Sequence, residues 1–355
     1  DFWILAQYAN AIYGSLLFDC INVSNRSWSI QQQKDHSNWT RHLSLPQRIH
    51  SLGGHLLYYD PCNTLAMVTQ MRSRSGRSPW FLAYDPYIDA VILSIRGTKS
   101  LRDVMTSINN RSLFRHSPLG MVPIQNSCHD SRSLVLAHSG YYTTALNISS
   151  RLRALHVLEG LFHNYRPTIP IPQYVYDAVF MHFCYHLDTN NTRFIITGHS
   201  LGGGVALILS FILFDQNPNT CVVFSPPGQS ILQTSHTRWE QSVTCVIIGN
   251  DLVPRFSFRS WSLFLRVGDH SNMFPIEHRF LRKLFRPRSR ISLHHIECSL
   301  PGTIVHYVRE EPSITRVSVC TEEPVHCERN QSADSLSSLV IAPHCVSDHF
   351  ICFVH

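Results

Sequence analysis

The chain has 355 residues, 44% of them hydrophobic, and a formal net charge of +6. This length and apolar content allow a large buried core and fit either one large α/β domain or two smaller ones. One domain is preferred, because no internal repeat, long linker or low-complexity block separates two halves. Its 11 cysteines form no C-x-x-C pair. Neither a zinc site nor a compact disulfide framework is therefore predicted, and most of the cysteines are expected to be free thiols.

Hydrophobic strands alternate with helical patterns, which predicts an α/β protein with a mostly parallel central sheet flanked by helices. A single domain is expected, with a helical or irregular lead-in at residues 1–80 and a core at residues 81–355 that carries insertions at about 109–136 and 256–290. The longest apolar run is too short to cross a bilayer, so no segment of this sequence is predicted to span a membrane. The predicted elements are, in chain order, the strands Ala90–Ile95 and Arg193–Thr197, the helix Leu201–Phe214, and the strands Cys221–Ser225, Val243–Ile248 and Ile291–Val308.

The segment Thr197-Gly-His-Ser-Leu-Gly-Gly-Gly204 lies between a β-branched strand and an apolar helix. This is the setting of a nucleophile elbow, in which a sharp strand-to-helix turn exposes a serine hydroxyl to a base. Gly198 and Gly202 are expected to relieve the strained turn at Ser200. The sequence therefore predicts Ser200 as a serine nucleophile, against the simpler interpretation of a glycine-rich turn before a buried helix.

Hydrolases of this kind place an acid and then a histidine after the serine, each at the end of a strand or in the loop that follows. Asp251 comes directly after a predicted strand and is the candidate acid, although it would also suit an ordinary Asn-Asp turn. His349 is the preferred base among the 22 histidines, with His344 and His355 as its rivals. The histidines at positions 294, 295 and 306 are interpreted as structural because they fall in or beside a predicted strand.

An oxyanion hole requires two backbone N–H groups that point at the developing negative charge. The residue after the nucleophile, Leu201, is expected to supply one of them. The strand Ala90–Ile95 ends in Arg96-Gly-Thr98, where Thr98 could offer the second N–H and a hydroxyl. The alternative for this segment is a turn that simply ends a strand.

Taken together, six segments resemble the class 3 lipases, which have the α/β-hydrolase fold. The resemblance covers the chain from about Phe81 to its end, and within the family it is strongest to the sn-1-specific diacylglycerol lipases. The six segments are Ser94–Asp103, His138–Gly140, Thr197–Gly204, Gly249–Arg255, Leu300–Gly302 and Ser347–His349.

The resemblance implies a serine lipase that cleaves the sn-1 ester of diacylglycerol through an acyl-enzyme and releases a fatty acid and a 2-monoacylglycerol. It gives Ser200, Asp251 and His349 the roles of nucleophile, acid and base, and it assigns the oxyanion hole to Thr98 and Leu201. A lid would begin near Ser100, and residues 256–290 would form a regulatory loop. No metal or other cofactor is required, and calcium stimulation is implied by the resemblance alone. Two other interpretations stay open: a phospholipase A1 or triacylglycerol lipase of the same family, or a catalytically silent hydrolase fold that serves as an interaction module.

The segment His278–Arg290 contains six Lys or Arg residues and no acidic residue. A short helix here could place apolar side chains in lipid while its cations meet anionic headgroups, although a solvated surface helix or basic loop is an equal alternative. Nucleic-acid binding is less favoured because the chain has no recognisable nucleic-acid module. The resemblance implies a membrane-associated protein with a cytoplasmic catalytic domain and transmembrane segments upstream of this sequence. The candidate membrane contacts are Phe280, Arg282, Lys283, Leu284, Phe285 and Arg286.

Overall fold

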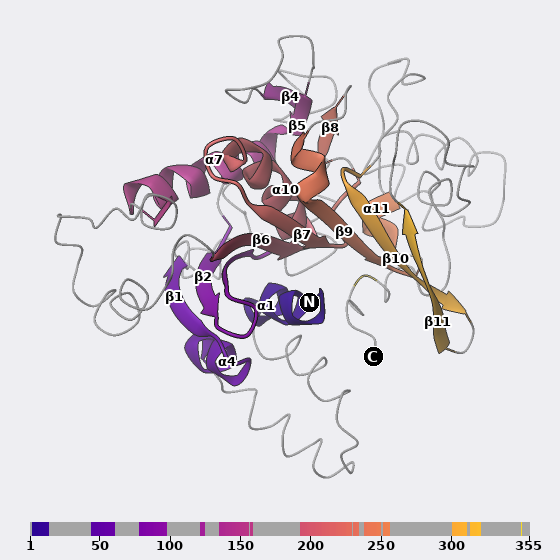
Figure 1. The fold of residues 1–355 in the computed structure, drawn as a ribbon. Helices are drawn as coiled ribbons and strands as arrows, with labels where there is room; N and C mark the ends of the chain where they lie inside the picture. Colours follow the sequence, from indigo (N-terminus) through magenta and orange to yellow (C-terminus); the bar gives the residue numbers. More distant parts are fainter. Residues whose placement is uncertain are drawn as a thin grey trace, which may run out of the picture.

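A twisted sheet forms the centre of the protein in the computed structural model (Figure 1). Within the described residues, this sheet has eight strands in the order β1-β2-β3-β6-β7-β9-β10-β11. The strands are β1 (His55–Asp60), β2 (Trp80–Asp85), β3 (Ala90–Ile95), β6 (Arg193–His199), β7 (Thr220–Phe224), β9 (Val243–Ile248), β10 (Thr303–Glu310) and β11 (Ser313–Cys320). The structure describes residues 2–13, 44–60, 78–97, 121–124, 135–155, 157–158, 192–228, 230–233, 238–249, 251–255, 300–310, 313–320 and 349.

The middle of the sheet is parallel and its two edges are antiparallel. Strands β3, β6, β7, β9 and β10 run parallel to their neighbours, whereas β1, β2 and β3 pair antiparallel at one edge and β10 and β11 at the other. All residues of β3 are buried, and only Arg193 of β6 is exposed. Continuous apolar strands of this kind are typical of a parallel sheet that is covered on both faces, so the predicted architecture is confirmed.

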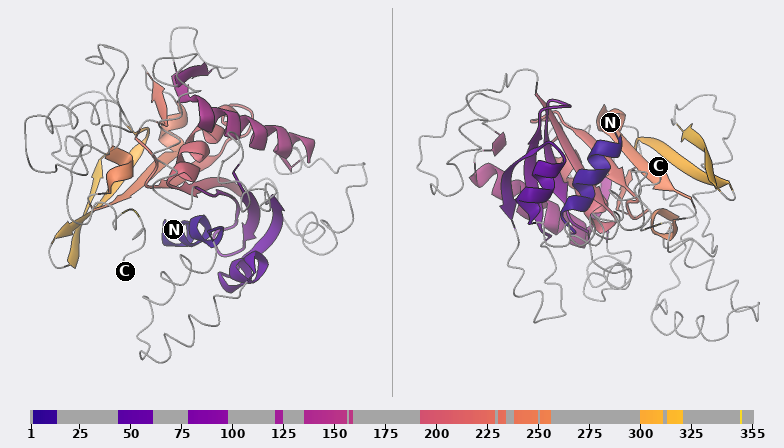
Figure 2. Two further views of the ribbon diagram at one scale, coloured as in Figure 1. Left: turned by 180° about the vertical axis from the view of Figure 1, so that it is seen from behind. Right: turned by 90° about the horizontal axis from the view of Figure 1, so that it is seen from below.

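Helices cover both faces of the sheet, as Figure 2 shows. Helix α10 (Leu201–Leu213) lies between the sheet and α7 (Ser139–Ala154), and it is buried on nearly every side. Helix α7 buries a stripe that includes Tyr141, Ala145, Ile148 and Leu152, which repeats at the spacing of one helix face. The opposite face of the sheet carries α1 (Phe2–Ala11) and α4 (Leu45–Ser51), which pack with alternate side chains of the same strands.

The lead-in packs on the sheet through buried polar contacts as well as apolar ones. The hydroxyl of Tyr8 donates a 2.8 Å hydrogen bond to the carboxylate of Asp85, and Arg48 Nε donates to the carbonyl of Ala11 at 2.9 Å. Burial, and then the nearby carboxylate, raise the pKa of Tyr8, so the phenol stays protonated. These contacts fix the end of α1 above strands β3 and β6.

Two parts of the chain differ from the expected elements. The predicted strand Ile291–Val308 is interrupted at residues 300–302, and β10 (Thr303–Glu310) begins after them, because Pro301 has no N–H to donate and Gly302 has a left-handed φ of 76°. Residues 291–299 of this prediction lie outside the described residues. Within the expected insertion at 109–136, the described residues include two strands, β4 (Met121–Ile124) and β5 (Val135–His138), which form a small sheet with β8 (Ile231–Gln233). The insertion therefore contributes ordered strands beside α7.

Among the described helices, none combines the length and the hydropathy that a bilayer crossing requires.

Candidate active site

The turn at Ser200 has the backbone geometry of a nucleophile elbow. Strand β6 ends at His199, helix α10 begins at Leu201, and between them Ser200 has φ 57° and ψ −130°. A positive φ is strained for a residue with a β-carbon, and such strain is found at functional turns that the surrounding structure holds in place. The Ser200 N–H is fixed by a 2.9 Å hydrogen bond to the carbonyl of Phe224 in β7.

Three glycines allow the backbone segments around this turn to approach closely. A β-carbon on Gly198 would lie 2.6 Å from the carbonyl carbon of Gly202, and one on Gly202 would lie 2.7 Å from the nitrogen of Gly97. Both distances are far inside van der Waals contact. The end of β3, the end of β6 and the first turn of α10 therefore meet at glycines, as the sequence predicted for Gly198 and Gly202.

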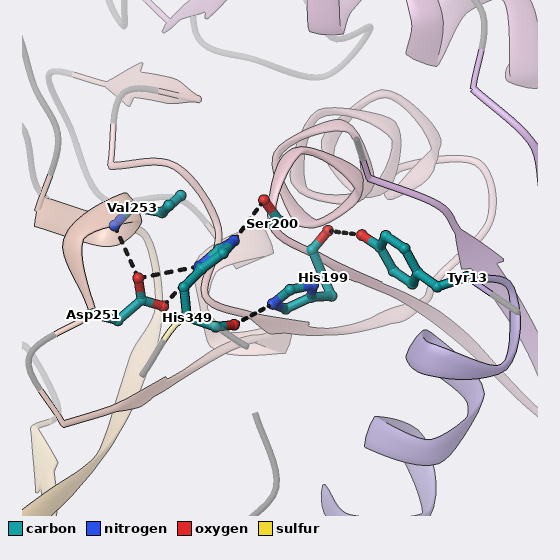
Figure 3. A network of polar contacts seen from close by, with 6 residues as sticks. All are labelled: Tyr13, His199, Ser200, Asp251, Val253 and His349. Carbon is teal, nitrogen blue, oxygen red and sulfur yellow. Dashed lines mark hydrogen bonds and ion pairs between the residues drawn. The ribbon is translucent and has the colours of Figure 1, made fainter. Parts of the chain in front are cut away.

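The structure brings Ser200, His349 and Asp251 together (Figure 3). His349 Nε2 lies 2.9 Å from Ser200 Oγ, while His349 Nδ1 lies 3.1 and 3.0 Å from the two carboxylate oxygens of Asp251. All three side chains are buried, with exposed fractions of 2%, 2% and 0% for the serine, the histidine and the aspartate. With Nδ1–H donated to the carboxylate, Nε2 is left to accept the serine proton.

The loop that carries Asp251 is held by several hydrogen bonds. Asp251 Oδ1 also accepts the N–H of Val253 at 2.9 Å. Two positions earlier, the carbonyl of Gly249 accepts from His306 Nε2 at 2.8 Å and from Arg255 Nη2 at 3.4 Å. His306 therefore has the structural place that the sequence predicted, whereas the support from Arg255 was not predicted, although Arg255 ends the segment Gly249–Arg255 that carries the family resemblance.

His199 is a polar neighbour of the triad that sequence reasoning missed. Its Nε2 donates to the carbonyl of His349 at 3.0 Å, and the two imidazole rings lie 4.7 Å apart with an angle of 32° (Figure 3). Burial, and next the charge of His349, hold the pKa of His199 well below its usual value. A neutral His199 adds no positive charge beside His349. Its position directly before the serine was the one available signal.

The other predicted site residues are placed only in part. Leu201 is the first residue of α10, so its N–H is among those at a helix start that have no acceptor within the helix. Thr98 follows Gly97 and lies outside the described residues, as do the rival bases His344 and His355 and all six candidate membrane contacts between Phe280 and Arg286. Within the described ranges, no group of three His, Cys, Asp or Glu side chains is placed to hold a metal ion.

Buried histidines make the stability of the fold sensitive to acid. Burial lowers the pKa of His138 from 6.5 to about 4. As the pH falls below about 6.5, the unfolded chain binds a proton at this residue that the folded chain does not bind. The contribution of His138 to stability is therefore present near pH 7 and is lost as the pH falls toward 4.

We expect this single group to reduce the free energy of unfolding by about 2 kcal/mol between pH 7 and pH 5. Denaturant unfolding at the two pH values measures the loss in the native chain and in His138→Gln, which cannot titrate. The pH-dependent loss should be smaller in the variant by about that amount. If the native chain and His138→Gln lose the same free energy of unfolding between the two pH values, His138 is not the cause of the acid sensitivity.

The sequence of the chain is similar to those of known lipases. A family model described as "Lipase (class 3)" matches residues 92–261. The chain is similar to diacylglycerol lipase-alpha of Homo sapiens, with 24% identity over 306 residues that cover 77% of this chain and 26% of the relative. It is also similar to diacylglycerol lipase-beta of Mus musculus, with 26% identity over 220 residues that cover 61% of this chain and 26% of the relative. The chain thus spans about a quarter of the length of these curated relatives.

The fold is also found among solved structures. A crystal structure of a mutant form of MDLA from Penicillium cyclopium superposes with a TM-score of 0.51 and 12% sequence identity, covering 98% of this chain and 93% of that one. At this identity the likeness concerns the fold alone. Together with the mostly parallel sheet and its flanking helices, it confirms the predicted α/β-hydrolase fold.

Proposed function

Because the class 3 lipase family model matches residues 92–261 of this chain, we propose that it hydrolyses a carboxylic ester of a lipid, and more narrowly the sn-1 ester of diacylglycerol. The observation that carries the proposal is the pair of hydrogen bonds that joins Ser200 to His349 and His349 to Asp251. This order of nucleophile, base and acid is the one that acyl transfer by a serine requires.

In the proposed reaction, His349 Nε2 accepts the proton of Ser200 Oγ while the oxygen attacks the ester carbonyl. Asp251 stabilises the imidazolium that forms, and the N–H groups of Leu201 and Thr98 bind the oxyanion. Collapse of the tetrahedral intermediate breaks the bond to the glycerol oxygen, which takes the proton from His349. Water, deprotonated by the same histidine, then hydrolyses the acyl-enzyme and releases the fatty acid.

Diacylglycerol is the proposed substrate because curated proteins similar to this chain are named diacylglycerol lipases. Cleavage at the sn-1 position would leave a 2-monoacylglycerol. We propose that the chemistry needs no metal ion, since its proton transfers and charge stabilisation are assigned to side chains and backbone N–H groups of the chain itself.

We also propose that the protein works at a membrane surface, on the cytoplasmic side. Its substrate would reside in the bilayer, and the segment His278–Arg290 combines apolar residues with six cations and no acidic residue. Such a segment favours binding to a surface of anionic lipid. In this proposal, residues 256–290 control access to the site as a regulatory loop.

Substrate profiling tests the proposed specificity. Purified protein is incubated with vesicles that contain 1,2-diacylglycerol with two different acyl chains, and the products are identified by mass spectrometry. We expect the fatty acid of position 1 and the corresponding 2-monoacylglycerol, with Ser200→Ala as the blank. Matched vesicles that contain phosphatidylcholine or triacylglycerol measure the two related activities.

Each result has a distinct meaning. Release of fatty acid from phosphatidylcholine but not from diacylglycerol would replace the proposed substrate with a phospholipid, and preference for triacylglycerol would replace it with that lipid. Folded protein that hydrolyses none of the three, and no soluble ester either, would contradict the enzymatic function.

A further inference from the structure

The side chain of Tyr13 joins two backbone segments that flank the candidate oxyanion hole. Tyr13 lies two residues after the end of α1, and its N–H donates to the carbonyl of Asn10 at 2.9 Å. Its hydroxyl accepts the N–H of Gly97 at 2.8 Å and donates to the carbonyl of His199 at 3.0 Å. Figure 3 shows the second of these bonds beside the triad. A single hydroxyl therefore uses both its donor and its acceptor capacity on main-chain groups.

These two main-chain groups are next to the groups that the reaction would use. Gly97 precedes Thr98, and His199 precedes Ser200 and Leu201. Strands β3 and β6 are parallel neighbours whose register ends with Ile95 opposite Gly198. Beyond this pair, β6 must turn sharply into α10, so the strands cannot continue side by side. The hydroxyl of Tyr13 connects them just beyond this pair, at the second residue after Ile95 and the first residue after Gly198.

The contact is reinforced by packing. The Tyr13 ring meets the His199 imidazole edge to face, with centroids 5.8 Å apart at 71°. A β-carbon on Gly97 would lie 2.6 Å from the carbonyl oxygen of His199 and would also overlap the Tyr13 hydroxyl. The hydroxyl, Gly97 and His199 therefore fill one another's space, and a small shift of Tyr13 would move both backbone segments.

We propose that Tyr13 is a positioning residue that fixes the backbone at Gly97 against the backbone at His199, the segments that lead to the proposed oxyanion donors, an inference that rests on the proposed esterase function. Through His199, which donates to the carbonyl of His349, the same residue also helps to hold the base. The hydroxyl of Tyr13 contacts the main chain at Gly97 and His199 and is not assigned a contact with a reacting atom. Its effect comes from fixing N–H groups where charge develops in the transition state, and such interactions change kcat more than KM.

Through Tyr13, the lead-in at residues 1–80 contributes to the geometry of the site. Tyr13 lies before residues 92–261, which match the lipase family model. The bridge joins Tyr13 to Gly97, which lies 84 residues later in the sequence, and to His199, which lies 186 residues later. A catalytic core cut to begin after Tyr13 would keep the triad and lose this hydroxyl.

The test compares Tyr13→Phe with Tyr8→Phe, which removes the hydroxyl of a buried tyrosine in the preceding helix α1. Tyr13→Phe keeps the aromatic ring and removes the hydroxyl that makes the bridge. On a soluble p-nitrophenyl ester we expect kcat to fall about 10- to 100-fold with KM unchanged within about twofold. The inhibition constant of an alkyl boronic acid, which forms a tetrahedral adduct with the serine, should rise by a similar factor.

Tyr8→Phe loses the hydrogen bond to Asp85 and should lower Tm, while its kcat and boronate inhibition constant stay at the native values. Native kcat in Tyr13→Phe, equal losses of kcat in the two variants, or a loss of kcat with unchanged boronate inhibition would each overturn the positioning role. If Tyr13→Phe does not fold, 4-aminophenylalanine at position 13 replaces it, since its amino group still donates but accepts poorly. For that variant a change in Tm without a parallel change in kcat and boronate inhibition would contradict the proposal.

Hydrogen exchange separates this inference from the proposed function. The peptide that contains the Gly97 amide should exchange faster in Tyr13→Phe than in Tyr8→Phe, whether or not the protein is an enzyme. If the Gly97 amide exchanges faster in Tyr13→Phe but the native protein hydrolyses no ester, the proposed function is overturned, and the role of Tyr13 in catalysis with it. Ester hydrolysis by the native protein with unchanged kcat in Tyr13→Phe would overturn the role of Tyr13 alone.

Discussion

The Ser200→Ala variant is expected to lose ester hydrolysis by about a million-fold in kcat, which places it at the background rate. The reason is that the proposed reaction passes through a bond between Ser200 Oγ and the acyl carbon, and alanine offers no nucleophile. The oxyanion donors remain, so any residual rate would come from them and from binding. Initial rates on a p-nitrophenyl ester measure the effect, and a fluorophosphonate probe that labels activated serines provides an independent measurement.

Ser225→Ala is the matched control for this variant. Ser225 is also buried, follows a neighbouring parallel strand, and has a positive φ of 48°. Its substitution removes a similar hydroxyl from a similar turn without touching the triad. We expect Ser225→Ala to be labelled by the fluorophosphonate probe and to keep the native kcat. Ser200→Ala should be neither labelled nor active. Labelling that persists in Ser200→Ala would show that another residue is the nucleophile.

The Asp251→Asn variant is expected to reduce kcat by about 10,000-fold while the protein stays folded. Asparagine has nearly the same shape and can still accept the N–H of Val253, which holds this loop. Its amide group, however, can donate to His349 Nδ1 and would favour the tautomer with the proton on Nε2. That nitrogen then cannot accept the proton of Ser200, and the imidazolium also loses its carboxylate partner.

Steady-state rates on the soluble ester, together with thermal unfolding, measure this second prediction. Asp85→Asn is the control, because Asp85 is a buried carboxylate that binds Tyr8 on the lead-in, away from the triad. We expect Asp85→Asn to lose stability and keep its kcat. A folded Asp251→Asn variant whose kcat lies within tenfold of the native value would contradict the assignment of the acid.

Much of the fold was predictable because its signals are local. Strands β3, β6, β7 and β9 are short runs of apolar residues whose burial on both faces follows from their composition. The strand predicted across residues 300–302 was wrong, since the apolar pattern continues through Pro301 and Gly302 but the pairing of β10 with β9 begins at Thr303. Hydropathy alone does not show where a strand finds its partner.

The candidate site was predictable to the extent that its residues are tied to such elements. Ser200 could be identified from the glycines beside it, and Asp251 from its place after a strand. His349 was chosen from 22 histidines by chain order and by a family resemblance, because no residue beside it encodes its contact with Ser200. Tyr13 and His199 were missed because a hydroxyl bridge between two main-chain groups leaves no spacing pattern in the sequence.

The sequence by itself determined the elbow at Ser200, the parallel strands and the buried helix α10, since each depends on residues within a few positions of one another. Only the tertiary structure decided which histidine faces the serine, how the loop at Asp251 is supported, and that a tyrosine of the lead-in connects Gly97 to His199. The physical reason is that the glycines of a strained turn and the apolar pattern of a strand or helix are neighbours in the sequence. The hydrogen bonds of the site join groups that lie up to 186 residues apart in the sequence, and they exist only after the sheet and its helices have packed.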